Sequence, residues 1–215
     1  MKILKENIVP FERFGSNTGL MFFLPLKTKA YAIGREGFID RGTEGICALE
    51  LDTKALDLKG ESKHLFESSG KVMNSGAGSF GNSIYRHFGN RFNFFDYAHM
   101  GNIFNVSDDK TKFMCYYTLI PNEKRDKLNK DVIGIHVFDE NLTKLWGFET
   151  EMPYSEAQMD NLGYTLTNDG KVCMLVRVNE GEDEENGTKD KTKRSYHYEV
   201  LVYRKGISKP KIVVI

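Results

Sequence analysis

A polar turn followed by an apolar strand occurs repeatedly along this chain, and this pattern limits the fold more than any other feature of the sequence. It is clearest in "NVSDDKTKFMCYYTL" (105–119) and "TLTNDGKVCMLVRV" (165–178), and looser in "LPLKTKAYAIGRE" (24–36). Each strand is followed by a polar stretch of variable length and then by a second strand, which reads "GICALELD", "VIGIHVFD" or "SYHYEVLVY". Such recurrence is typical of repeat architectures, in which each copy buries its apolar faces against its neighbours.

The segments between the turns alternate in polarity and are rich in β-branched and aromatic residues, which predicts β-strands. Asp and Asn at the turns bond to the backbone two residues on, and Gly170 supplies a positive φ where one is needed. The stretch "SEAQMDNLG" (155–163) is the clearest candidate for a helix, and it is long enough for at most a turn or two. Each repeat is therefore expected to form a four-stranded antiparallel sheet.

We predict an all-β chain in which three to four such sheets stack as the blades of a β-propeller, because a single sheet cannot bury both of its faces. A single propeller-like domain is expected over residues 1–215. Its repeat units are expected at roughly 20–70, 98–155 and 160–215, with a glycine- and aromatic-rich connection at 70–97. The three recognisable units leave open whether the set of blades is complete. A β-sandwich of consecutive hairpins is the alternative packing.

The turn motifs resemble the S-P-D-G-K-like hairpins of propeller repeats. The matching residues are Ser107, Asp109 and Lys112 in one copy, and Asp169, Gly170 and Lys171 in the other. Asp108 and Asn168 replace the proline of that pattern. The order of segments over residues 98–205 is similar to that of propeller-type cell-envelope proteins of Bacteroidetes. This resemblance implies a propeller fold and an extracytoplasmic location, in the periplasm or at the cell surface. It implies no activity, because propellers host unrelated functions.

Composition restricts the partners of the chain. Thirty basic residues balance thirty acidic ones, whereas a nucleic-acid binder normally has a basic excess, so no nucleic-acid partner is expected.

No apolar run reaches the roughly 18 residues of a membrane-spanning helix. The N-terminal "MKILKENIVPFERF" lacks the apolar core of a signal peptide. Two interpretations follow, a cytoplasmic protein or a processed or truncated piece of an exported one.

The glycine-rich hexamer "GAGSFG" (76–81) matches the nucleotide-binding pattern G-x-G-x-x-G. A kinase would also need H-R-D and D-F-G motifs, and neither follows in the 134 residues after Gly81. A dinucleotide-binding fold would need a strand before the glycines and a helix after them, and neither pattern is present. We therefore interpret this stretch as a spacer between blades and predict no cofactor.

The remaining candidate residues point to no chemical site. Cys47, Cys115 and Cys173 each lie in an apolar, strand-like run and are expected to be buried thiols. His136 and His197 are interpreted as occupying matching places in the second strands of two units, which would make a metal site conceivable. No carboxylate lies at a helpful spacing, so no metal is predicted. No catalytic motif is found, and the chain is expected not to be an enzyme.

The most unusual composition is the aromatic run "RHFGNRFNFFDYAHM" (86–100). Burial between blades is one interpretation of it, and an exposed patch for a partner protein or a sugar is the other. The candidate partner surface consists of Arg86, Phe88, Arg91, Phe92, Phe94, Phe95 and Tyr97.

Together these observations predict a non-enzymatic binding or scaffold domain of the bacterial cell envelope that mediates protein–protein interaction. The alternatives are a glycan-acting hydrolase or lyase that uses the central face of a propeller, and a carbohydrate-binding module. An enzyme would need carboxylates from several blades to converge. A binding module would instead show an exposed, contiguous aromatic patch without such acids.

Overall fold

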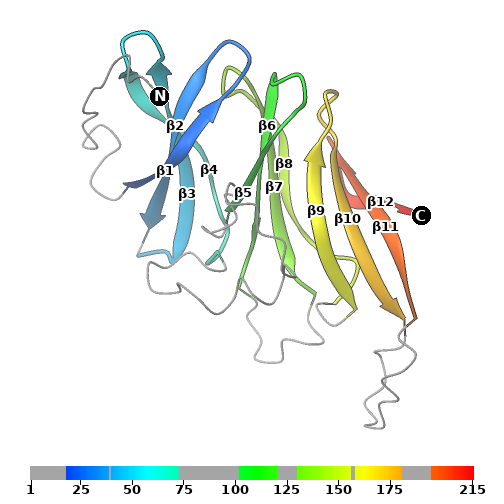
Figure 1. Ribbon diagram of the computed structural model, residues 1–215. Coiled ribbons are helices and arrows are strands. Elements are labelled where there is room, and N and C mark those ends of the chain that lie inside the picture. The colour runs from blue at the N-terminus through cyan, green and yellow to red at the C-terminus, as the bar shows by residue number, and fades with distance from the viewer. Residues whose placement is uncertain (1–17, 39, 73–101, 121–129, 156–157, 181–194) are drawn as a thin grey trace, which may run out of the picture.

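The computed structural model describes residues 18–38, 40–72, 102–120, 130–155, 158–180 and 195–215. Within these ranges the regular structure consists entirely of β-strands (Figure 1). The strands are β1 (Thr18–Pro25), β2 (Ala30–Phe38), β3 (Thr43–Asp52), β4 (Asp57–Glu67), β5 (Asn102–Val106), β6 (Lys112–Thr118), β7 (Val132–Asp139), β8 (Lys144–Glu151), β9 (Met159–Leu166), β10 (Val172–Glu180), β11 (Ser195–Arg204) and β12 (Ile207–Val214).

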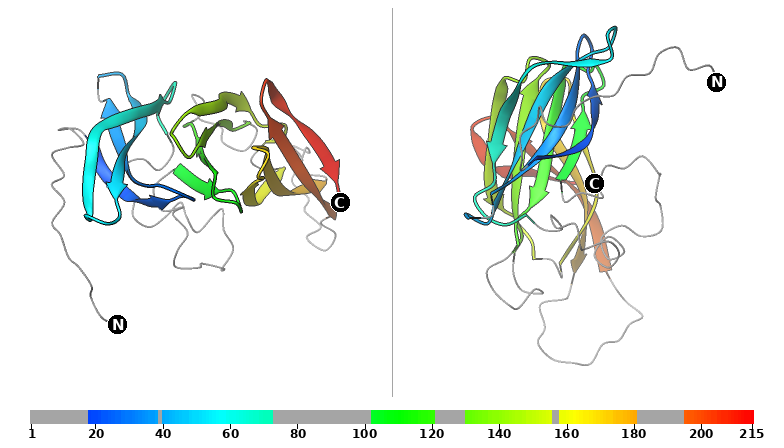
Figure 2. Two further views of the ribbon diagram at one scale, coloured as in Figure 1. Left: turned by 90° about the horizontal axis from the view of Figure 1, so that it is seen from above. Right: turned by 90° about the vertical axis from the view of Figure 1, so that its left-hand side faces the viewer.

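Four consecutive strands form each of three sheets, and every neighbouring pair of strands is antiparallel. Seen from above, the sheets stand side by side, with β1, β5 and β9 along one side of the row and β4, β8 and β12 along the other (Figure 2). This is the arrangement of propeller blades, which confirms the prediction of an all-β, propeller-like fold. We call the sheets β1–β4, β5–β8 and β9–β12 blades 1, 2 and 3. Blades 1 and 3 form the two ends of the row.

The repeated turn motifs close equivalent hairpins in blades 2 and 3. In blade 2, Ser107 N–H donates to the Lys112 carbonyl at 3.0 Å, and Lys112 N–H donates to Ser107 Oγ at 3.0 Å. In blade 3, Thr167 and Lys171 form the same two hydrogen bonds, each 2.9 Å long. A hydroxyl at the first turn position therefore has the same role in both blades, as the repeat indicated.

These two turns fix which positions of the blades correspond. A left-handed residue lies in the middle of each, Lys110 with φ of 58° and Gly170 with φ of 84°. Glycine adopts this conformation without steric cost, whereas Lys110 adopts it against the preference of its side chain. With the turns aligned, Phe113 at the start of β6 corresponds to Val172 at the start of β10.

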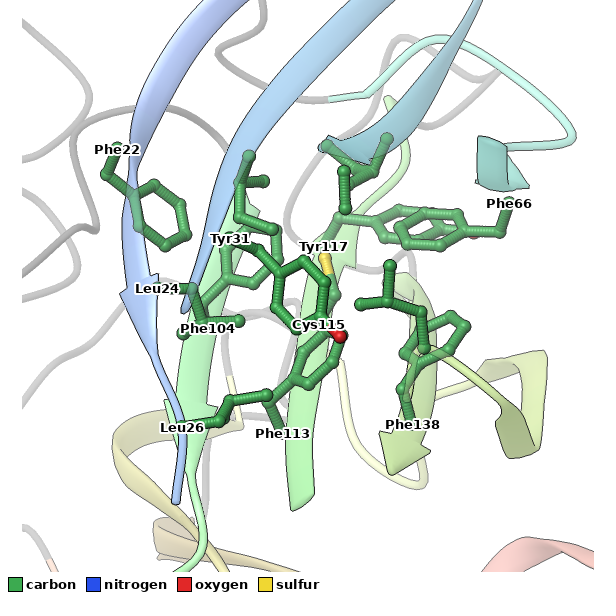
Figure 3. Packing of buried hydrophobic residues seen from close by; sticks show 14 of the residues in the cluster. Phe22, Leu24, Leu26, Tyr31, Phe66, Phe104, Phe113, Cys115, Tyr117 and Phe138 are labelled. Carbon is green, nitrogen blue, oxygen red and sulfur yellow. The ribbon is translucent and has the colours of Figure 1, made fainter. Parts of the chain in front are cut away.

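Blades 1 and 2 share one hydrophobic core (Figure 3). The Phe113 ring stacks on Phe138 with their centroids 5.2 Å apart, and the Phe66 ring stacks on Tyr117 at 5.6 Å. The core also contains Phe22, Leu24, Leu26, Tyr31, Ile33, Ile46, Ala48, Phe104 and Cys115. Stacked aromatic rings from both sheets thus hold the first two blades together.

A second core lies between blades 2 and 3. Blade 2 contributes Met114, Tyr116, Ile133, Ile135, Val137 and Trp146, and blade 3 contributes Leu166, Val172, Met174, Val176, Val178, Leu201 and Tyr203. The indole Nε1–H of Trp146 donates to the Gly170 carbonyl at 2.8 Å and ties the outer strand of blade 2 to the turn of blade 3. Blade 2 is therefore buried on both faces, as a blade inside a stack must be.

Over 155–163, where the sequence allows at most a turn or two of helix, the described residues from Met159 onward belong to β9. This strand pairs with β10, and the register of that pair shifts between Leu175 and Val176. Asn161 and Gly163 lie at this irregularity, where the Gly163 N–H donates to Asn161 Oδ1 at 3.2 Å. Pairing with β10 outweighs the weak helical preference of such a short segment.

Candidate functional site

The predicted aromatic partner surface lies outside the described residues. This applies to Arg86, Phe88, Arg91, Phe92, Phe94, Phe95 and Tyr97. The glycine-rich stretch 76–81 lies outside them as well. The candidate site is therefore built from the three blades themselves.

The predicted equivalence of His136 and His197 is wrong. His136 in β7 lies opposite Cys115, and the equivalent position in blade 3, opposite Met174, is Leu201. His197 lies four residues earlier along β11, opposite Val178. Each histidine contacts a different carboxylate cluster, and within the described ranges no group of three His, Cys, Asp or Glu residues is arranged to hold a metal ion.

His136 belongs to a polar cluster at the contact between blades 1 and 2. The Tyr117 hydroxyl donates to Glu149 Oε1 at 2.7 Å and lies 3.1 Å from His136 Nε2. Since the tyrosine has a single proton, the neutral imidazole donates its Nε2–H to the tyrosine oxygen. Glu149 also accepts hydrogen bonds from the backbone N–H and the hydroxyl of Ser69, which follows β4 of blade 1. This cluster links the two blades.

The surroundings of His136 keep its ring uncharged. The ring stacks on Phe66 at 4.0 Å, and its Nδ1 has no hydrogen-bond partner among the described residues. A Cβ at Gly147 would lie 2.3 Å from that nitrogen, so only glycine fits beside it. Burial, together with the nearby positive charge of Lys144, lowers the pKa of His136 from 6.5 to about 3.

A pH dependence of stability follows from this histidine. Between its unfolded pKa of 6.5 and its folded pKa of about 3, the unfolded chain binds more protons, so the free energy of unfolding falls as the pH is lowered through this window. The expected loss is about 2 kcal/mol by about pH 5. Urea unfolding over this range should show the slope in the wild type and in a His64→Gln control. The slope should disappear in His136→Gln, and its persistence there would contradict the assignment.

A second carboxylate is held in the same way near the contact between blades 2 and 3. The Tyr154 hydroxyl lies 3.0 and 2.9 Å from the two oxygens of Glu199, and His197 Nε2 lies 2.9 Å from Glu199 Oε1. Glu199 is buried, so these hydrogen bonds replace the water that the carboxylate gives up. Glu149 and Glu199 thus serve different blade contacts and form no shared pair of acids.

The face of blade 3 that points away from blade 2 differs from the other blade faces, because its apolar side chains are exposed. Leu175 of β10 is 39% exposed, and Tyr198 and Val213 of β11 and β12 are each 41% exposed. Cys173, Val200 and Val202 on the same face are half-buried. This face, which we call the open face, consists of Asp160, Thr165, Cys173, Leu175, Arg177, Tyr196, Tyr198, Val200, Val202, Lys211 and Val213. The expectation of three buried thiols therefore holds for Cys47 and Cys115 but not for Cys173.

The open face corresponds position by position to a buried face of blade 2. With the turns aligned, Met114 and Tyr116 of β6 correspond to Cys173 and Leu175 of β10. In the next strand, Ile133, Ile135 and Val137 of β7 correspond to Tyr198, Val200 and Val202 of β11. The three β7 residues are 0% exposed because blade 3 covers them. Blade 3 thus has the composition of a blade that is covered on both faces, while no sheet among the described residues covers its open face.

A polar and aromatic cluster lies at one end of the open face. Arg177 donates to Asp160 Oδ2 from Nε at 3.0 Å and from Nη2 at 2.7 Å. Its guanidinium lies 5.5 Å from the centre of the Tyr196 ring, and Tyr196 meets Tyr198 edge-on at 5.6 Å. Arg and Tyr are over-represented among the residues that dominate binding at protein interfaces. Here contacts with Asp160 and with each other fix the positions of Arg177, Tyr196 and Tyr198 in the protein alone.

The polarity pattern of β10 and β11 is a sequence signal for this face, separate from the turn motifs. Strands exposed on one side alternate between apolar and polar residues, whereas strands buried on both sides are apolar throughout. The segment "VCMLVRV" of β10 is apolar on both faces except at Arg177, and "VLVY" of β11 is apolar throughout. These runs indicate that both faces of blade 3 are built for burial.

Comparisons with known proteins leave the family open. No known protein family matches the sequence, and no curated protein matches it. Among solved structures, the chain is similar to an α-L-arabinanase of Penicillium chrysogenum, solved with arabinobiose, at 14% identity and a TM-score of 0.38, covering 88% of this chain and 45% of that one. It is also similar to an endo-arabinase of Bacteroides thetaiotaomicron, at 12% identity and a TM-score of 0.33, covering 93% and 55%. A third match is hydrazine synthase of Kuenenia stuttgartiensis, at 7% identity and a TM-score of 0.35, covering 87% and 50%.

The chain spans about half of the length of these solved structures. Every TM-score lies below 0.5, so the evidence for the propeller-like fold is the chain's own three sheets. In the part of the chain that the structure describes, no helix is long and apolar enough to cross a membrane.

Proposed function

We propose that this protein is a non-enzymatic interaction domain, a scaffold that binds a partner protein through the open face of blade 3. The observation that carries the proposal is the greater exposure, in blade 3, of positions whose counterparts in blade 2 are buried. Removing an apolar face from water is the main driving force of protein association. The partner that fits such a face is another β-sheet, because the covered faces between blades 1 and 2 and between blades 2 and 3 each pack against a sheet.

Charge and chemistry agree with a protein partner. The ion pair with Asp160 compensates the positive charge of Arg177, and Lys211 adds a single further positive charge to the open face, far fewer than a nucleic-acid surface needs. The two exposed tyrosines meet at an interplanar angle of 77°, whereas a sugar-stacking platform presents one flat aromatic face. The location in the bacterial cell envelope, taken from the resemblance of the turn motifs, is part of this proposal.

The glycan-acting alternative has less support among the described residues. An enzyme of that class needs two carboxylates on either side of the bond that is cleaved. Glu149 and Glu199 instead accept hydrogen bonds from tyrosines at two different blade contacts. A carbohydrate-binding module would show binding on a glycan array that depends on Tyr196 and Tyr198.

Affinity capture with matched variants tests the proposal. The immobilised protein, its Leu175→Glu variant and a Phe23→Glu control are exposed to an extract of the native cells. Phe23 is also an exposed apolar residue, 46% accessible, but it lies on β1 of blade 1. We expect a stoichiometric protein on the wild type and on the control, reduced at least about tenfold on Leu175→Glu, since a charge at the centre of an apolar contact is left without a partner. Equal retention on all three would contradict the proposal.

A further inference from the structure

We propose that the open face is the contact surface of a two-fold dimer, in which the open face of a second copy of this chain covers it. The inference rests on the proposed function and names the partner. Blade 3 lies at one end of the row of blades (Figure 1). Its other face packs against blade 2, so the open face points away from blade 2. A second copy presents a face of the same size and composition, so each open face meets the kind of surface that covers the equivalent face of blade 2.

The contact joins two open faces because the other end of the row is closed. On the face of blade 1 that points away from blade 2, Ala32, Cys47, Leu49 and Leu58 are at most 3% exposed. Phe23, opposite Ala32, is the exposed apolar side chain of this face, while the centre of the face is covered. Blade 3 of one copy therefore meets at blade 1 of the next a face with far less exposed apolar surface than a second open face offers. A head-to-tail chain of copies is thereby disfavoured, and an isologous contact that uses the same patch twice is favoured.

The geometry also favours packing of faces over pairing of edges. β12 is the last strand of blade 3, and its sequence "ISKPKIVV" includes Lys209, Pro210 and Lys211. Proline has no N–H to donate to a neighbouring strand, and edge lysines oppose strand addition. The edge of the sheet is thus protected while its face is apolar.

The size of the face sets the expected strength of the dimer. Four strands about 4.8 Å apart, each about eight residues long at about 3.3 Å per residue, give a face of about 500 Å², so two faces bury about 1,000 Å² in total. This is near the lower limit for a specific interface. Leu175 and Val200 lie directly opposite each other at the centre of the face, and Tyr196, Tyr198 and Arg177 lie at one end. We therefore expect a reversible dimer whose population rises with concentration.

Sedimentation equilibrium of the full chain, from micromolar to millimolar concentration, tests the inference. The wild type and the Phe23→Glu control should rise from the monomer mass toward twice that mass. Leu175→Glu and Tyr198→Glu should each weaken the association at least about tenfold. Circular dichroism shows whether each variant is folded. The two substituted residues lie on different strands, so if one variant fails to fold, the other still tests the inference.

Labelling of Cys173 provides a second readout. Cys47 and Cys115 are buried, so Cys173 is the described thiol that a reagent reaches first. Its labelling by a thiol reagent should slow as the protein concentration rises in the wild type but not in Leu175→Glu. A monomer at all concentrations with unprotected Cys173, or a dimer unaffected by both open-face variants, overturns the inference. Leu175-dependent capture of a different protein by such a monomer would retain the proposed function and overturn only the dimer.

Discussion

Replacing Phe113 by alanine is expected to lower the free energy of unfolding by about 3–5 kcal/mol, the largest effect of any substitution considered for this protein. Phe113 is 0% exposed, and its ring stacks on Phe138 in the core between blades 1 and 2. Removing the ring takes its apolar surface out of the core and leaves a cavity that residues from two different sheets would have to fill. Such a cavity collapses poorly, because each sheet is held rigid by its own backbone hydrogen bonds.

Phe23→Ala is the matched control for this prediction. Phe23 lies on β1, next to the core residues Phe22 and Leu24, but is 46% exposed, so its loss should cost about 1 kcal/mol or less. Urea unfolding followed by circular dichroism gives both values, and unchanged m-values would show that the same surface is exposed in each variant. Similar costs for the two variants would mean that blades 1 and 2 do not share the core seen in Figure 3.

Gly134→Ala is expected to destabilise the protein by about 3 kcal/mol through overpacking. A Cβ at Gly134 would lie 2.0 Å from Cζ of Tyr117 and 2.4 Å from its Cε1. The ring cannot move aside easily, because it stacks on Phe66 and its hydroxyl is hydrogen-bonded to Glu149. The added methyl group would therefore disturb both the aromatic core and the polar cluster of blades 1 and 2.

Gly37→Ala separates this steric effect from the general effect of replacing a strand glycine. A Cβ at Gly37 in β2 meets no atom within 4 Å. Alanine there should change stability by no more than about 1 kcal/mol, and in the favourable direction, because it restricts the unfolded chain. The measurement is the difference between the two variants in the urea midpoint. Equal midpoints would show that Tyr117 does not pack against Gly134.

Much of the fold was predictable from local patterns. The turns at 107–112 and 167–171 combine a hydroxyl, an aspartate and a left-handed residue, and these groups bond within a few residues of one another. Alternating β-branched and aromatic runs on either side specify strands through backbone geometry alone. Antiparallel hairpins follow directly, since short polar turns join strands that are neighbours in sequence.

The candidate site was much less predictable. The aromatic residues at 86–97 lie outside the described residues and stay a prediction, whereas the open face lies on β10 and β11. The equivalence of His136 and His197 was wrong for a reason of register. The sequence shows which strand contains a histidine, but the residue opposite that histidine depends on the register with the neighbouring strand. The registers place His136 opposite Cys115 and His197 opposite Val178.

By itself, the sequence determined the class of this protein: the turns, the strands and the repetition of four-stranded sheets, because these depend on hydrogen bonds and side-chain periodicity over short distances. Only the tertiary structure decided which of the apolar faces are covered. Met114 and Leu175 look alike as strand residues, yet one is fully buried and the other is 39% exposed. That difference arises from the place of each sheet in the row, since blade 2 has a neighbour on both sides and the open face of blade 3 has none among the described residues.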